Sequence, residues 1–159
     1  HGAKPKYFHK LTGGNFPLDE IQAAVLDVKL KKLESWHEAR RRNAEYYNEA
    51  LKNSAVSIPR AIYKDADITN YHIYNQYIIR VANRDKVREQ LKSADIGCEI
   101  YYPLPLHSQE CFLKFGYKKG DMPESERAAN ETLSLPIYPE LTKEMQNYIV
   151  ETLCQIQYL

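Results

Sequence analysis

The sequence predicts an α/β fold in which a long helix precedes a small sandwich of helices and strands. Apolar residues recur at helical spacing from Pro17 to about Asn53, which indicates an amphipathic helix, open to a bend near Trp36. Beyond Asn53, short β-rich segments are separated by helical segments and hairpin signals are few. This pattern is typical of a compact α/β sandwich with a small, mostly antiparallel sheet. Residues 1–53 and 54–159 are therefore expected to form two units.

The first 14 residues read as an irregular arm that leans on another surface, because they hold three glycines and a proline. Gly13 and Gly14 permit a tight turn before the helix. In that turn Asn15 is placed as a helix cap, Pro17 suits the first helical turn, and Asp19 complements the positive end of the helix dipole. A turn of this kind also presents an amide and free N–H groups to an anion such as phosphate. A well-capped helix with no ligand is the competing interpretation.

The second unit is expected to alternate strands and helices. Runs of β-branched and aromatic residues predict three strands, over residues 56–58, 71–82 and 98–102. Helical periodicity and capping residues predict four helices, over residues 86–94 (capped by Asp85), 109–115, 123–132 and 142–157. The prolines at 136 and 139 lead us to interpret residues 133–141 as a connection between two helices.

Composition indicates a globular protein without unusual partners. Of the 159 residues, 43% are hydrophobic and 27% are charged, and the net charge is only +1, so neither nucleic acid nor an anionic membrane is expected as a partner. No apolar run approaches the roughly 18 residues of a membrane helix. The 13 tyrosines suit sugar-binding walls and subunit interfaces, and equally suit half-buried strands.

The cysteines and histidines show no metal-binding spacing. The three cysteines lack a C-x-x-C pair, and the five histidines lack an H-E-x-x-H pattern. We therefore expect no metal site and no disulfide framework. Free thiols of this kind fit a reducing, cytoplasmic location.

Short motifs follow one another in a defined order along nearly the whole chain. They are His1-Gly2, Lys6 to His9, the Gly13-Gly14-Asn15 turn, Leu18 to Ala24, the Arg40-Arg41-Arg42 run, Tyr71 to Tyr74, Ile100 to Gln109, and Leu133 to Leu141. In this order the chain resembles the C-terminal portion of the DegT/DnrJ/EryC1/StrS family of sugar aminotransferases, which use pyridoxal phosphate.

The resemblance implies the C-terminal part of a fold-type I aminotransferase that acts as a homodimer. Such an enzyme converts a keto group on a nucleotide-linked sugar to an amine, commonly with glutamate as amino donor. The product is an amino sugar for polysaccharide or a glycosylated metabolite. The lysine that forms the Schiff base lies upstream of the resembling segment in this family and is missing here. We therefore expect a fragment that is inactive alone and does not bind the cofactor covalently.

The resemblance also implies which residues meet the cofactor. Asn15 matches the asparagine that reaches the cofactor phosphate of the partner subunit. Pro17 stands where members usually carry arginine, so a guanidinium is missing beside this turn.

Five further residues match positions that line the substrate site. Tyr7 and His9 match a segment that lines the neighbouring active site. Tyr101, Tyr102 and His107 lie on the stretch that touches the nucleotide-sugar, with Tyr101 replacing the usual histidine. Core packing explains poorly a histidine that follows two prolines, so His107 is expected to face the pocket.

Two other functions stay open. One is a pyridoxal-phosphate-dependent sugar dehydratase of the same fold, in which histidine replaces the Schiff-base lysine. The other is a non-catalytic module for dimerisation or sugar binding, which the long helix and glycine-rich arm would also suit.

Overall fold

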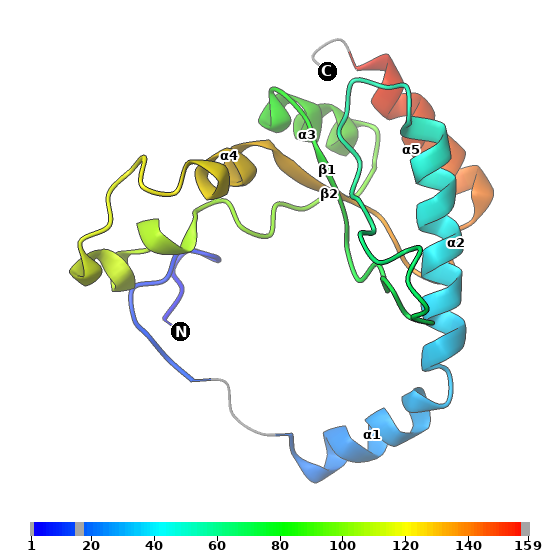
Figure 1. Ribbon diagram of the computed structural model, residues 1–159, viewed down its shortest axis with the longest axis horizontal. Coiled ribbons are helices and arrows are strands. Elements are labelled where there is room, and N and C mark those ends of the chain that lie inside the picture. Colours follow the sequence, from blue (N-terminus) through cyan, green and yellow to red (C-terminus); the bar gives the residue numbers. More distant parts are fainter. Residues whose placement is uncertain (1, 15–17, 157–159) are drawn as a thin grey trace.

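The computed structural model describes residues 2–14 and 18–156. It combines helices with one small antiparallel sheet (Figure 1), which confirms the mixed character of the expected fold. Along the chain lie α1 (Glu20–Leu30), α2 (Leu33–Leu51), β1 (Tyr77–Arg80), α3 (Arg84–Ser93), two 3-10 helices (Leu106–Ser108 and Glu110–Phe115), α4 (Pro123–Glu131), β2 (Thr132–Leu135) and α5 (Lys143–Gln155).

The two strands form an antiparallel pair that faces the helical core on one side. Tyr77 lies opposite Leu135, and Ile79 lies opposite Leu133. All four side chains are buried. Because successive strand residues point to opposite faces, the residues between them point away from this core. The sheet therefore has a core face and an outer face.

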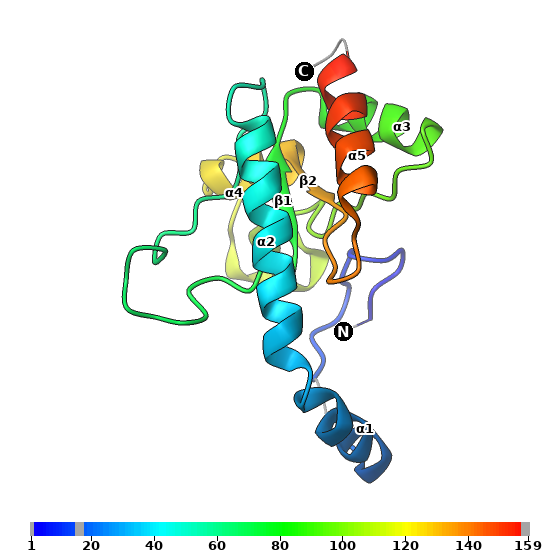
Figure 2. The same ribbon diagram turned by 90° about the vertical axis from the view of Figure 1, so that its right-hand side faces the viewer.

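The core face is covered by α2, α3 and α5 (Figures 1 and 2). Tyr47 of α2 is fully buried; its ring centroid lies 4.9 Å from that of Tyr77, and its hydroxyl donates to the Pro136 carbonyl. Burial raises the pKa of both phenols, so they stay neutral. Gln146 of α5, also buried, donates from Nε2 to the Asn43 carbonyl at 2.9 Å. Aromatic packing thus joins α2 to β1, and one buried amide joins α2 to α5.

The helix expected over 17–53 is two helices, and its predicted cap is wrong. The N-cap of α1 is Asp19, whose carboxylate accepts from the Gln22 N–H at 2.8 Å, so the helix begins after both Asn15 and Pro17. The break falls between α1 and α2, at residues 31–32, rather than near Trp36. Asn15 and Pro17 themselves lie outside the described residues.

α1 stands apart from the other described elements (Figures 1 and 2). It buries no side chain, and Ile21 is 80% exposed and Val28 is 68% exposed. Because α1 packs none of its side chains into a core formed by residues 2–14 and 18–156, its start is determined by the local Asp19 cap. Within those residues, no helix is both long and apolar enough to cross a bilayer.

The predicted strands are longer than the observed ones. Residues 56–58 and 98–102 form only single antiparallel bridges, Ser57 to Arg80 and Glu99 to Ser134. The strand expected over 71–82 is reduced to β1, because Tyr74 adopts a left-handed backbone (φ 44°) that interrupts extended structure. Residues 132–135 form strand β2, which pairs with β1, although residues 133–141 were expected to be a connection between two helices.

Helix α3 is anchored by an arginine rather than capped by Asp85. The N-cap position is Asn83, and Asp85 lies in the first turn, where its carboxylate accepts from Arg84 Nε at 2.8 Å. The buried Arg84 also donates to the carbonyls of Ala129 and Thr132. These bonds tie α3 to the junction of α4 and β2.

The remaining predicted helices are confirmed with small shifts. α4 begins at Pro123 as expected and ends one residue early. Thr142 caps α5 by accepting from the Met145 N–H. Residues 110–115 are helical as a 3-10 turn.

A carboxylate of α4 holds the loop that precedes this helix. Glu126 Oε1 accepts from the Gly120 N–H at 2.7 Å and lies 3.0 Å from His107 Nε2. Gly120 has φ 98°, a conformation that favours glycine. The bond from Gly120, and then that from His107, hold the pKa of the Glu126 carboxyl below its ordinary value. The ionised form of Glu126 therefore stabilises this loop.

Removing the Tyr47 ring should cost far more than removing its hydroxyl. We expect Tyr47→Phe to lower the free energy of unfolding by about 1 kcal/mol, the usual worth of one hydrogen bond. Tyr47→Ala should lower it by about 3–5 kcal/mol, because it empties a packed site. Urea denaturation measures both, and equal losses in the two variants would contradict this view of the core.

The Glu126 contacts should make stability depend on acid. Because the folded-state pKa is lowered, the contribution is complete above the ordinary glutamate pKa of about 4.3 and is lost as pH falls through the lowered value. Thermal unfolding between neutral and acidic pH should therefore show a smaller loss for Glu126→Gln than for the unmodified protein. Glu124→Gln, at an exposed position of the same helix, is the control and should retain the original pH slope. Identical slopes in all three proteins would exclude this role for Glu126.

Candidate substrate cavity

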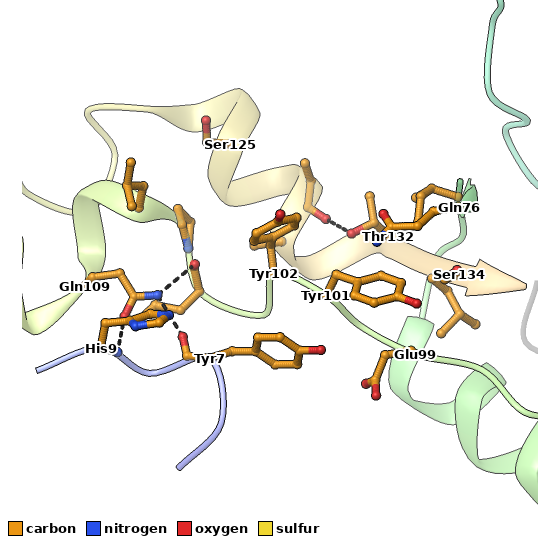
Figure 3. A pocket seen from close by; sticks show the side chains of 17 residues that line it. Tyr7, His9, Gln76, Glu99, Tyr101, Tyr102, Gln109, Ser125, Thr132 and Ser134 are labelled. Atoms are coloured by element: carbon orange, nitrogen blue, oxygen red, sulfur yellow. Dashed lines mark hydrogen bonds between the residues drawn. The ribbon is translucent and has the colours of Figure 1, made fainter. Parts of the chain in front are cut away.

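A cavity of about 500 Å³ lies on the outer face of the sheet. Ile78 and Ser134, paired across the two strands, form part of its floor. Around them, residues of the N-terminal arm, the segment after Glu99, and α4 form the walls (Figure 3). The same sheet therefore separates a helical core from an open pocket.

Four of the predicted site residues come together in this cavity. Tyr7 and His9 enter from the arm, and Tyr101 and Tyr102 enter from the segment that follows the Glu99 bridge (Figure 3). Tyr102 is 76% exposed, whereas the other three are half-buried. Their proposed contacts with substrate stay a prediction, but the chain does bring them to one place.

His107 does not share this cavity, contrary to the expectation. It is buried, its Nε2 lies 3.0 Å from Glu126 Oε1, and its ring and that of Tyr117 are nearly perpendicular, with centroids 6.5 Å apart. The residues beside it form a separate apolar hollow, which Phe112 and Met122 also line. The half-buried Glu126 of α4 thus holds the imidazole beside this hollow, and His107 is not among the residues that line the cavity with Tyr102. Asn15, the expected phosphate ligand, lies outside the described residues.

Sequence reasoning gave no separate role to Gln109. This glutamine is 5% exposed and lines the cavity. Its Oε1 accepts from the His9 N–H at 2.8 Å, and its Nε2 donates to the Tyr7 carbonyl at 2.9 Å and to the Leu104 carbonyl at 3.5 Å. Two of these bonds cross 100 or more residues of sequence. The one feature of the sequence that could have pointed to Gln109 is its place as a polar residue at the end of the Ile100 to Gln109 motif.

Glu99 is the one carboxylate among the described residues that line the cavity. A hydrogen bond from the Ile100 N–H, and then the nearby ammonium of Lys6, lower the pKa of Glu99, and Lys6 Nζ lies 3.6 Å from Glu99 Oε2. Among the lining residues that the structure describes, none is lysine or arginine. The other polar groups are phenols, hydroxyls, amides and an imidazole, which suit the hydroxyl groups of an uncharged ligand.

Covalent attachment of pyridoxal phosphate does not fit this cavity. That attachment requires a lysine amine within the pocket, and the lining set above contains none. The described residues that line this cavity therefore include no amine that could hold the cofactor as a Schiff base.

Comparison with known proteins identifies close relatives that are longer than this chain. Residues 1–154 match the DegT/DnrJ/EryC1/StrS aminotransferase family. A protein named pleiotropic regulatory protein, from Geobacillus stearothermophilus, is 46% identical over 98% of the chain and 41% of its own length. A dTDP-3-amino-3,6-dideoxy-alpha-D-galactopyranose transaminase from Aneurinibacillus thermoaerophilus is 32% identical over 99% of the chain and 42% of its own length.

The structure also resembles a solved structure over nearly its whole length. DesV of S. venezuelae, crystallised in complex with a ketimine intermediate, superimposes with a TM-score of 0.77 at 30% identity, over 97% of this chain and 40% of DesV. The chain thus spans about two fifths of the relatives it matches. Because the family match covers nearly every residue, the chain belongs to the DegT/DnrJ/EryC1/StrS aminotransferase family.

Proposed function

We propose that this chain is the C-terminal part of a pyridoxal-phosphate-dependent aminotransferase that acts on a nucleotide-linked sugar. The complete enzyme converts a keto group of the sugar to an amine, with glutamate as donor, for polysaccharide or glycosylated-metabolite synthesis. The observation that carries the proposal is the cavity in which Tyr7, His9, Tyr101 and Tyr102 meet. Family membership and the transaminase named above support it.

In this proposal the cavity binds and orients the sugar. Phenol hydroxyls of Tyr101 and Tyr102 offer hydrogen bonds to sugar hydroxyls, and the tyrosine rings offer apolar faces. Tyr7 and His9 close the opposite wall. Among the described lining residues none is lysine or arginine, and the nearby Lys6 is paired with Glu99, so we assign the sugar, rather than the diphosphate, to this space.

The cofactor supplies the electron sink for transamination when bound, and its lysine belongs to polypeptide outside this chain. Asn15 is proposed to contact the cofactor phosphate of the partner subunit in a homodimer. Residues 1–53 are proposed to be an arm and a long interface helix from the edge of the large domain, with residues 54–159 as the small domain. The chain alone is then inactive, and its enzyme works in the cytoplasm.

A dimerisation module without catalysis is the second candidate. The exposed apolar side chains of α1 favour it, because such a helix lowers its free energy by burying them against a partner. A sugar dehydratase of the same fold is separated from the aminotransferase by the identity of the missing Schiff-base residue.

The isolated chain should not react with pyridoxal phosphate. At equimolar cofactor we expect no absorbance band that depends on one particular lysine when this chain is added, because no lysine is among the described residues that line the cavity. The complete enzyme, as control, should shift the spectrum. A shifted band with the isolated chain, abolished by one Lys→Ala substitution, would contradict the proposal.

Tyr102→Ala should weaken binding of the nucleotide-sugar to the complete enzyme. Loss of one hydrogen bond and one ring contact predicts an increase of roughly tenfold in the Kd for dTDP-glucose or UDP-N-acetylglucosamine, measured by calorimetry. Tyr63→Ala removes a comparably exposed tyrosine that does not line the cavity and should leave Kd unchanged. Equal Kd values for both variants would argue against the cavity as the sugar site.

A further inference from the structure

We propose that Gln109 is a positioning residue that fixes Tyr7 and His9 in the wall of the cavity and thereby sets the affinity for the sugar. The ligand part of this inference rests on the proposed function. The contacts of Gln109 stand independently of it, because they are made within the chain.

One side-chain amide holds the arm at two points. Gln109 accepts from the backbone of His9 and donates to the backbone of Tyr7, at 2.8 and 2.9 Å (Figure 3). The Cys111 N–H adds a bond to the His9 carbonyl at 3.2 Å. Because these partners are backbone groups, the bonds fix the course of the arm and leave the side chains of Tyr7 and His9 directed to the cavity.

The conformation of Tyr7 requires such support. Its φ is 72°, in the left-handed region that non-glycine residues rarely adopt. Residues in this region persist where surrounding contacts determine them. The bond from Gln109 to the Tyr7 carbonyl lies at this turn, and the Ala3–His9 bridge closes the arm behind it.

The same amide also contacts the other wall. Gln109 Nε2 lies 3.5 Å from the carbonyl of Leu104, and Leu104 lines the cavity two residues after Tyr102. Gln109 therefore sets the separation between the arm and the segment that carries Tyr101 and Tyr102. A change in that separation alters both sides of the pocket at once.

Gln109 both accepts and donates a hydrogen bond, which requires an amide. Substitutions can therefore remove one of these bonds or both. Gln109→Glu keeps an acceptor for His9 and loses the donor for Tyr7. Gln109→Met keeps a similar volume and loses both. The matched control is Gln146→Met, since Gln146 is an equally buried glutamine that donates to a backbone carbonyl in the core, away from the cavity.

The test uses the complete enzyme and two readouts. The first is hydrogen exchange at the His9 amide, which should be slow in the unmodified protein and Gln109→Glu and faster in Gln109→Met. The second is the Kd for dTDP-glucose and UDP-N-acetylglucosamine, which should rise roughly tenfold in Gln109→Met and less in Gln109→Glu.

The control separates positioning from general stability. Gln146→Met should lower the melting temperature and leave both the His9 exchange and the Kd values unchanged. Unchanged hydrogen exchange at the His9 amide in Gln109→Met would overturn the proposal that Gln109 holds the arm in place. Faster exchange with unchanged Kd would overturn its influence on sugar binding. If neither nucleotide-sugar binds the unmodified enzyme, the proposed function fails, and the exchange data still decide whether Gln109 holds the arm.

Discussion

The alternation of side chains across one pair of short strands determines the rest of this structure. Tyr77 and Ile79 face helices on one side, and the intervening Ile78 faces the cavity on the other. A shift of register by one residue would exchange these two sets. Burial of the core face fixes the register, and the register in turn places polar Ser134 in the cavity floor. Stability and ligand binding are thus linked through the same few residues.

Local signals predict the helices of this chain better than its strands. The period of α2, the proline that begins α4 and the threonine that caps α5 are each present within a few residues, so they could be predicted. Strand β2 has only four residues, and its identity depends on pairing with β1 more than 50 positions away. The limits of α1 follow from Asp19 and from the absence of a partner among the described residues, which the apolar pattern does not reveal.

In the site, too, short motifs in the sequence predict some residues, whereas contacts between distant segments determine the roles of others. Resemblance to the family assigned Tyr7 and His9 to one lining segment and Tyr101, Tyr102 and His107 to another. Tyr7, His9, Tyr101 and Tyr102 line one cavity, and their contacts with substrate stay a prediction. His107 is not among the residues that line this cavity; its Nε2 lies beside Glu126 of α4, a contact that the local sequence does not reveal. Gln109 received no role because its bonds join segments about a hundred residues apart. Which polar residue contacts substrate and which supports the backbone is decided by tertiary structure.

The most direct test of this account is a crystal structure of the complete enzyme with a nucleotide-sugar bound. The account predicts sugar hydroxyls within hydrogen-bonding distance of Tyr101 or Tyr102, on the outer face of the sheet, with the arm in place beside them. A sugar bound elsewhere, with this cavity filled by the remainder of the enzyme's own polypeptide, would contradict it.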